Sequence, residues 1–456
     1  MIKKSIERSI AEQFGDFMKN KSNYLFLYKS LLGAFYGSDP WINENKVDFI
    51  LQSISERDCI LAKFFLLCES VKKESLLSVI GDEICQFLID SGYAYLEGEN
   101  IIPDNYVLIP IKNKLLVVNP PYRKFRNGKK VPDLYVGADS LKLINFFKGE
   151  KKETMLDLCS GSGIIGIALS DYIDKIDFIE IREDVIDVLN FNLMINRISK
   201  DRVRVIRSDL FNELEEKKYD YIVTNPPFIP TPKNEMLPIC GDGGNDGLDI
   251  VRRILDDFKK HLNLNGRLYM VLEAIGDENK PFAVDLFKNK FSKGTVNVSL
   301  SNRQVIEEQA KVSAIISKDM FDSIESIKEL YDLWMKLFEA LGATYIYPVL
   351  FEYILSDKDI EINIFRNYED IDRTLSYKIS EKVEVEPVEK TMYRVITDVS
   401  SFIADNEMRE LIGDGEVKTL NDLIKKDSSR YFEYLKNIKY LNDKGIIDIV
   451  EILYFW

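Results

Sequence analysis

The chain has a single histidine, His261, among its 456 residues. Ser-His-Asp triads, multi-histidine metal sites and histidine proton relays all need a histidine in a defined place. His261 lies in the run Phe258–Asn263, whose pattern is typical of a helix that ends at the protein surface. We therefore expect chemistry that proceeds without histidine.

Cysteines and long apolar runs are also scarce. The five cysteines are scattered and form no Cys-x-x-Cys pair, which argues against a disulfide framework or a metal site and favours a reducing, cytoplasmic location. No apolar run approaches the roughly 18–20 residues that a membrane-spanning helix needs. The basic N-terminus is followed by acidic residues rather than an apolar stretch, so we expect neither a secretory signal nor a membrane partner.

Positive charge is outnumbered, with 61 Lys and Arg against 75 Asp and Glu and a formal net charge of −14. This balance opposes non-specific binding to the phosphates of nucleic acid. The densest basic run is Arg123–Lys130. We interpret it as a solvated loop, with a local nucleic-acid contact as the alternative.

The length of the chain predicts two or three domains. Residues 1–134 have mostly helical patterns and then two short strands, Tyr93–Leu96 and Tyr106–Pro110, around a Gly-Glu-Asn turn. We interpret this part as a helical, winged-helix-like substrate or accessory domain. Residues 319–456 predict an α+β extension, winged-helix-like at its end.

Residues 135–318 alternate between strand and helix patterns, which predicts an α/β domain with a parallel, Rossmann-like sheet covered by helices on both faces. Two final strands, near Thr295–Leu300 and Lys311–Ser317, are expected to close the sheet. The central strands are expected at Thr154–Leu158, Ile176–Glu180, Arg202–Ile206, Tyr219–Val223 and Gly266–Leu272.

A glycine-rich turn, Asp157–Gly166, follows the first central strand and opens a helix. Glycines at such a turn let the backbone approach a nucleotide-like ligand closely. The turn alone is also compatible with a dinucleotide site. Asp157 favours a different ligand, because a carboxylate there can pair with the ammonium group of an amino acid.

Three further polar positions follow the next strands. Glu180 can accept hydrogen bonds from both hydroxyls of a ribose, and Asp209 from the exocyclic amine of an adenine. The run Asn225-Pro226-Pro227-Phe228 follows the fourth strand. Ligands of open α/β sheets bind at the carboxyl ends of the strands, so the four positions together indicate one site.

In these motifs the segment Tyr135–Ser317 resembles class I S-adenosylmethionine (SAM)-dependent methyltransferases. It is similar to the methyltransferase small domain and release factor glutamine methyltransferase group. Gly243–Asp249 resembles the Gly-Gly-x-Asp-Gly-Leu stretch that follows the catalytic loop in the glutamine-methylating branch. Phe228 stands where the group more usually has Tyr. The resemblance implies a seven-stranded, mostly parallel sheet.

The resemblance also implies SAM as cofactor, S-adenosylhomocysteine as product and no metal. The catalytic loop would be Asn225, Pro226, Pro227 and Phe228, with the Asn225 side chain and the Pro226 carbonyl accepting the two N–H groups of a planar NH2. The cofactor-binding residues would be Asp157, Cys159, Gly161, Gly163, Glu180, Ile181, Ser208, Asp209, Leu210 and Asn225.

A second copy of the loop motif, Asn119-Pro120-Pro121-Tyr122, precedes the glycine-rich turn. It is the better literal match, and circularly permuted DNA amino-methyltransferases have their catalytic motif before the SAM motif. Here the order glycine turn, Glu180, Asp209, Asn225 is already complete. We therefore assign catalysis to Asn225 and interpret the first copy as a turn between domains.

Three functions remain open from the sequence. The first is an N-methyltransferase that acts on an amide or amino NH2 of a protein, peptide or metabolite. The second is an RNA or DNA amino-methyltransferase, which the net charge disfavours. The third is a SAM-binding regulatory protein without turnover, against which the intact acceptor groups of the loop count.

Overall fold

The computed structural model describes most of residues 44–366 and shorter segments outside them. The described residues are 2–3, 7–22, 24–25, 27–28, 44–120, 134, 136–147, 150–232, 237–301, 303–320, 326–366, 375–379, 383–389, 392–397, 400–412, 416, 418–419, 441 and 447–452. The chain forms two compact units, the first comprising residues 1–33 and 37–363 and the second residues 34–36 and 364–456. Among the described residues, no helix is both long and apolar enough to cross a membrane.

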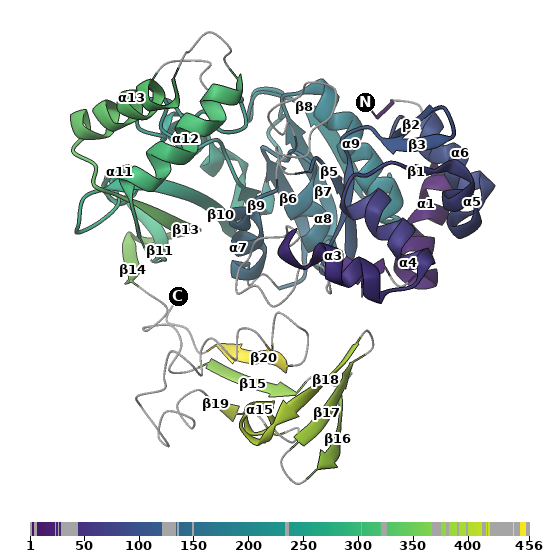
Figure 1. Ribbon diagram of the computed structural model, residues 1–456. Coiled ribbons are helices and arrows are strands. Elements are labelled where there is room, and N and C mark those ends of the chain that lie inside the picture. The colour runs from purple at the N-terminus through teal and green to yellow at the C-terminus, as the bar shows by residue number, and fades with distance from the viewer. Residues whose placement is uncertain are drawn as a thin grey trace. The chain divides into compact units, whose positions relative to one another are not determined.

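A central sheet organises the first unit (Figure 1). Its strand order is β14-β11-β13-β10-β9-β6-β7-β8, and the short β12 pairs with β13. The pairs β8-β7, β7-β6, β6-β9 and β9-β10 are parallel, whereas β13 is antiparallel to both β10 and β11. The strands are β6 (Lys152–Leu158), β7 (Ile173–Glu180), β8 (Val203–Arg207), β9 (Tyr219–Thr224), β10 (Leu262–Gly276), β11 (Lys293–Leu300), β12 (Gln304–Val305), β13 (Tyr345–Asp359) and β14 (Glu361–Arg366).

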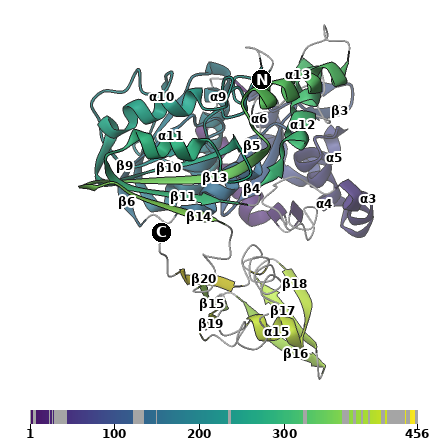
Figure 2. The same ribbon diagram turned by 90° about the vertical axis from the view of Figure 1, so that its left-hand side faces the viewer.

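The expected α/β class with a mostly parallel central sheet is confirmed. The path from β8 to β11 has seven strands, and β12 and β14 bring the described sheet to nine where seven were expected. Right-handed crossovers place the helices that follow β6 and β7 on one face and those that follow β9 and β10 on the other. In Figure 2 the latter two, α10 and α11, are both drawn above the strands of the sheet. These helices are α8 (Ile164–Leu169), α9 (Glu183–Ile195), α10 (Asp249–Asp257) and α11 (Ala283–Lys290).

The strand expected at Lys311–Ser317 is wrong. This segment lies within helix α12 (Ile306–Met320), and the closing strand is β13, which belongs to the sheet rather than to a separate C-terminal region. The buried positions of α12 include Ile306, Ala310 and Ala314, four residues apart. The β-branched Val312 and Ile315 are exposed side chains on the outer face of this helix.

The N-terminal part of the first unit combines helices with two small sheets. The helices are α1 (Arg8–Asp16), α3 (Glu44–Ser53), α4 (Glu56–Leu61), α5 (Lys73–Ile80) and α6 (Asp82–Asp90), with π-helical turns at Phe17–Lys21 and Ala62–Leu66. One sheet has the order β1-β3-β2, and the other pairs β4 with β5. The strands are β1 (Val71–Lys72), β2 (Ala94–Glu97), β3 (Asn100–Pro103), β4 (Val107–Ile111) and β5 (Lys114–Val118).

The partner strands of the expected hairpin differ from the expectation. β2 turns back at Gly98 and pairs with β3, while the expected second strand became β4, which pairs with β5. The winged-helix-like interpretation of this part stays a prediction.

Besides its pairing with β4, strand β5 is hydrogen-bonded to two side-chain amides at the C-terminal end of helix α9. Asn192 of α9 and Asn196, which follows the last residue of this helix, exchange hydrogen bonds with the backbone of Leu115 and Val117 at 2.6–3.1 Å. Asn192 Nδ2 also donates to the Ser162 carbonyl of the glycine-rich turn at 3.0 Å. The N-terminal part is therefore fixed directly to the segment expected to bind the cofactor.

The second unit, described by itself, is built mainly of strands. One sheet has the order β16-β17-β18 and the other β19-β15-β20. In this unit the charged segment Glu384–Glu389 forms strand β16. The elements are β15 (Leu375–Ile379), β16 (Glu384–Glu389), β17 (Met392–Thr397), β18 (Ser400–Asp405), α15 (Asn406–Ile412), β19 (Lys418–Thr419) and β20 (Ile447–Ile452).

His261 is not at the surface. Its side chain is buried, Nδ1 lies 3.1 Å from the Lys217 carbonyl, and the ring stacks on Phe211 with centroids 5.0 Å apart. The sequence pattern indicates a helical turn that ends near His261, but it does not indicate that the imidazole ring is buried. The role of His261 in this structure is packing.

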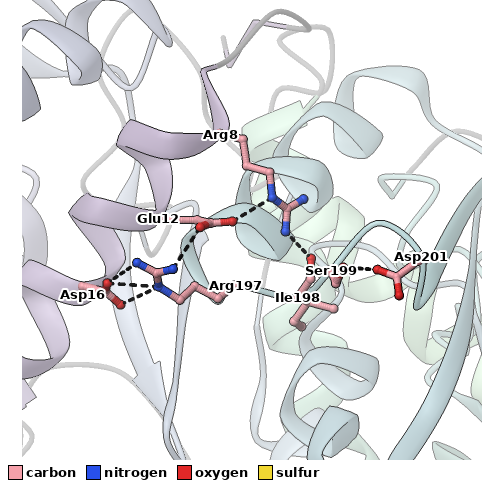
Figure 3. Close-up of polar contacts among 7 residues, drawn as sticks. All are labelled: Arg8, Glu12, Asp16, Arg197, Ile198, Ser199 and Asp201. Carbon is pink, nitrogen blue, oxygen red and sulfur yellow. Dashed lines mark hydrogen bonds and ion pairs between the residues drawn. The ribbon is translucent and has the colours of Figure 1, made fainter.

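Helix α1 docks on the end of α9 through charged groups (Figure 3). Arg197 pairs with Glu12 and Asp16, and Arg8 donates to the Ile198 carbonyl at 2.6 Å. Gly15 lies at the closest approach of the two helices, because a Cβ there would stand 1.9 Å from the Ile195 carbonyl oxygen.

We predict that Gly15→Ala destabilises the protein by about 1–3 kcal/mol, because the added methyl group meets backbone that cannot move aside without separating α1 from α9. Urea unfolding measures the change. Gln13→Ala, at an exposed position of the same helix, is the control and should change stability by less than about 0.5 kcal/mol. Equal stability of the Gly15→Ala variant and the wild type would contradict the close packing.

Candidate active site

The expected site residues lie along one edge of the central sheet, where β6, β7, β8 and β9 end. Asp157 is paired with Phe178 of β7 and with Val223 of β9, one residue before the end of its strand. Glu180 is the last residue of β7, and Asn225 follows the last residue of β9. The parallel strands thus bring together positions that are far apart in the sequence.

The turn after β6 depends on glycines at two kinds of position. Gly161 has a φ of 54°, and a Cβ there would meet no described atom within 4 Å. Its backbone is therefore open to close approach by a ligand. Gly166 is packed instead, since a Cβ would stand 2.4 Å from the Phe178 ring and 2.8 Å from Asp157 Oδ2. Helix α8 can lie against Asp157 only because this position is glycine.

Asp157 is completely buried. Its Oδ2 accepts the backbone N–H of Gly166 at 2.8 Å, whereas Oδ1 has no hydrogen-bond partner within the described structure. Burial, and to a lesser extent the charge of Glu180, raises the pKa of this carboxyl group to about 8. A buried acceptor without a donor is costly, which makes Oδ1 a candidate contact for a cationic ligand.

Glu180 lies opposite the glycine turn and is almost fully buried. Its Oε2 accepts the N–H of Gly161 and its Oε1 the N–H of Arg182, both at 2.9 Å. Each carboxylate oxygen keeps a second lone pair. The two fixed oxygens can therefore accept further hydrogen bonds from a diol.

The remaining residues expected to contact the cofactor lie at the same edge of the central sheet, but they differ in hydrogen bonding and burial. Asp209 Oδ2 accepts a hydrogen bond from Arg253 at 2.7 Å. Ser208 is used within its own turn, where Oγ donates to the Leu210 carbonyl at 2.9 Å. Ile181 is 41% exposed, which is unusual for an isoleucine beside a buried strand end. Burial raises the pKa of the Cys159 thiol to about 12, so this side chain stays protonated.

The side-chain amide of Asn225 is held from one side only. Its Nδ2 donates to Asp139 Oδ2 at 2.9 Å and to Ser140 Oγ at 3.0 Å. Its Oδ1 is buried and has no partner among the described residues. A carboxylate only accepts hydrogen bonds, so Asp139 fixes which end of the amide points toward it. Oδ1 is left as an oriented, unused acceptor.

Asp139 and Ser140 were not foreseen from the sequence. They lie in the first turn of helix α7 (Ala138–Phe146), 86 and 85 residues before Asn225. Asp139 Oδ1 also accepts the N–H of Ser140 at 2.8 Å. Near this carboxylate, burial and the charge of Asp139 raise the pKa of Glu273 on β10. The acidic start of α7 is a visible sequence signal, but nothing in the sequence links it to Asn225.

The loop that begins at Asn225 is bound along its exit by the glycine-rich segment. The N–H groups of Ile229 and Thr231 donate to the carbonyls of Gly241 and Gly244 at 2.9 and 2.8 Å. A Cβ on Gly247 would stand 2.3 Å from the Phe228 carbonyl oxygen. The Gly243–Asp249 stretch is therefore a close-fitting support for the loop.

The first copy of the motif has a different environment. Asn119 is buried, its Nδ2 donates to the Asn105 carbonyl at 2.8 Å, and its Oδ1 accepts the N–H of Leu134 at 2.9 Å. Both ends of this amide are used to hold the chain together. Pro121, Tyr122 and the basic run Arg123–Lys130 lie outside the described residues.

A family model named methyltransferase small domain matches residues 136–305. This part of the chain is similar to that family. The match contains the strand ends, the glycine turn and the Asn225–Phe228 loop described above. The resemblance found in the sequence is thereby confirmed for the methyltransferase small domain.

Curated relatives of the methyltransferase domain include two ribosomal protein uL3 glutamine methyltransferases. That of Francisella tularensis subsp. tularensis is 38% identical over 125 residues, which cover 25% of this chain and 40% of the relative. That of Xanthomonas campestris pv. campestris is 30% identical over 185 residues, which cover 37% and 58%. The chain thus spans about half the length of these relatives.

Solved structures similar to this chain include the 16S rRNA N2 G1207 methyltransferase of T. thermophilus in complex with AdoMet and guanosine. It is 16% identical, with a TM-score of 0.31 and 64% of each chain covered. The tRNA m1G37 methyltransferase of M. jannaschii is 14% identical, with a TM-score of 0.31 and 55% and 57% covered.

The environment of Asp157 predicts a pH dependence of stability. Because its pKa rises from 3.8 to about 8 on folding, the protonated group adds stability that is complete below pH 3.8 and is lost as the pH rises through about 8. Asp157→Asn cannot titrate. In urea unfolding without ligand, the wild type should lose stability relative to this variant between pH 5 and pH 8.5. A constant difference between the two proteins over this range would contradict the assignment.

Proposed function

We propose that this chain is a SAM-dependent N-methyltransferase that methylates a planar amide NH2 group of a protein. The observation that carries the proposal is the Asn225 side chain. Its Nδ2 is fixed by Asp139 and Ser140, and its buried Oδ1 remains available to accept a hydrogen bond. Such an atom at the carboxyl edge of a methyltransferase domain fits an N–H donor of the acceptor molecule.

The Asn225–Phe228 loop would compensate for the poor nucleophilicity of an amide nitrogen. Its lone pair is delocalised into the carbonyl group, so the nitrogen must be oriented and partly released from conjugation. In this proposal, Asn225 Oδ1 and the Pro226 carbonyl accept hydrogen bonds from the two N–H groups of the substrate amide, and this directs the nitrogen lone pair toward the methyl donor. The half-buried Phe228 ring stacks on the planar group. Prolines 226 and 227 keep the loop stiff, so little entropy is lost on binding.

The cofactor proposed for this site is SAM, whose sulfonium carries the methyl group that is transferred. The residues present fit it. Asp157 Oδ1, without a partner in the described structure, can accept the ammonium group of the methionine part, which would lower the raised pKa of this carboxyl again. Glu180 has lone pairs for the ribose hydroxyls, and the backbone at Gly161 is open to close approach.

The adenine end of the cofactor would lie beside Asp209 and Ile181. Arg253 holds Asp209 Oδ2, so Oδ1 is the oxygen that faces the exocyclic amine in this proposal. The exposed Ile181 side chain gives the base an apolar surface. Ser208 and Leu210 contribute through the backbone turn that their own hydrogen bond maintains.

A glutamine side chain is the acceptor group that the relatives favour, since two of them are named for glutamine methylation of ribosomal protein uL3. The net charge of −14 points the same way, because it suits a basic protein better than a nucleic acid. An amino group of RNA or DNA is the alternative acceptor. A SAM-binding protein without turnover would have no use for the oriented Asn225 amide.

The two Asn-Pro-Pro motifs give a matched test. Asn225→Ala should reduce kcat for methylation of recombinant uL3 by at least 100-fold, because the acceptor nitrogen loses its orientation. SAM affinity by calorimetry should change by less than about threefold. Asn119→Ala should lower thermal stability, because it removes the side-chain hydrogen bonds to the Leu134 N–H and the Asn105 carbonyl, but kcat per folded molecule should stay within about twofold.

Asp157→Asn completes the set, because it should weaken SAM binding at least tenfold while the loop stays intact. Similar losses of kcat in the Asn225 and Asn119 variants would overturn the assignment of the catalytic copy. Labelling of RNA but not of uL3 by the wild type would shift the acceptor to nucleic acid.

A further inference from the structure

Two helices stand between the last strands of the central sheet. β11 ends at Leu300 and β13 begins at Tyr345, and the chain between them contains β12, α12 and α13 (Ile327–Ala340). The two helices lie side by side in Figure 1 and share a buried cluster. This cluster, here called the α12–α13 cluster, consists of Leu237, Ile275, Ile306, Ala310, Ala314, Leu330, Trp334, Phe338, Ala343 and Ile346.

The α12–α13 cluster reaches the methyl-transfer loop. Ile275 belongs to the end of β10, and the partly buried Ile229 of the loop exit packs against the cluster. Trp334 is fully buried, and its indole Nε1 donates a hydrogen bond of 3.0 Å to the Pro230 carbonyl. A side chain 104 residues further along the chain therefore holds the backbone five residues after Asn225.

Because the loop is rich in proline, hydrogen bonds that hold residues 229–231 also restrict the position of Asn225. Residues 226, 227 and 230 are prolines, whose φ angles are locked and whose nitrogens donate no hydrogen bond. β9 holds the beginning of the loop, and the carbonyls of Gly241 and Gly244 hold the N–H groups of Ile229 and Thr231. The carbonyl is the only backbone hydrogen-bonding group of Pro230, and it accepts the hydrogen bond from the Trp334 indole.

We propose that Trp334 is a positioning residue for methyl transfer: its indole N–H sets the place of Pro230 and, through the stiff proline loop, that of Asn225 and the Pro226 carbonyl. This inference rests on the proposed function. In the simplest opposing account, Trp334 only fills the core of the two helices. The two accounts differ in what the N–H group does, as opposed to the ring.

Trp334→Phe removes the N–H group and keeps an aromatic ring in the cluster. Because a misplacement of about 1 Å can cost about 100-fold in rate, we expect kcat for methylation of recombinant uL3 to fall by at least tenfold. The KM for SAM should change by less than twofold, since the strand ends that bind it are untouched. Phe338→Leu is the matched control, because Phe338 is fully buried in the same cluster and its side chain has no donor for Pro230.

A second measurement needs no methyl acceptor. Hydrogen–deuterium exchange of the peptide that covers residues 225–231 reports on the N–H groups of Ile229 and Thr231. Exchange there should accelerate at least tenfold in Trp334→Phe and stay within twofold of the wild type in Phe338→Leu, with rates compared at equal distance below each melting temperature.

The two measurements separate the two proposals. If the wild type does not methylate uL3, the proposed acceptor fails, while exchange still decides whether Trp334 holds the loop. A Trp334→Phe variant with wild-type exchange in residues 225–231 and a kcat within twofold of the wild type would overturn the positioning role. Equal losses of kcat in Trp334→Phe and Phe338→Leu would do the same, because they would assign the effect to the cluster as a whole.

Discussion

The hydrogen bond between Asp139 and the Asn225 side chain is the contact on which the proposed chemistry depends. The carboxylate fixes the amide nitrogen, and only then does the amide oxygen become an oriented acceptor. The methyltransferase edge of the sheet, the helix α7 that presents Asp139 and the stiff loop after β9 all act on this one group. The same amide in Asn119 has both ends occupied and is a brace between neighbouring segments. Two identical tripeptides thus have different hydrogen-bond environments, which their neighbours set and their own atoms do not.

Support for the site is spread over parts of the chain that the sequence separates widely. Asn192 of α9 joins the N-terminal strand β5 to the glycine turn. Residues 241–244 bind the exit of the loop from one side, and Trp334 holds its Pro230 carbonyl. Each support contacts a backbone group of the turn or the loop, not the expected ligand. This arrangement suits a reaction that relies on orientation, because the binding groups are in place before the acceptor arrives.

The strands that carry the site could be predicted because they are largely apolar runs with polar residues at or just after their carboxyl ends, such as Glu180 at the end of β7 and Asn225 after β9. Three features could not. The segment Lys311–Ser317, expected as a strand, is part of helix α12, where the β-branched Val312 and Ile315 occupy the solvent face. Asp139 and Trp334 act through contacts with residues 86 and 104 positions away, which no local pattern encodes. His261 lies at the end of a helical turn, as expected, but its ring is buried against Phe211. This is a tertiary contact that the local sequence does not indicate.

The central claim is that Asn225 presents a planar amide nitrogen to the methyl donor. It is tested most directly by locating the transferred methyl group. Recombinant, unmethylated uL3 and total RNA would be incubated in parallel with the wild-type protein and methyl-labelled SAM, and the labelled atom would be assigned by tandem mass spectrometry. The account predicts label on the side-chain nitrogen of a glutamine in uL3. Label on a lysine or arginine nitrogen, or only on RNA, would contradict it.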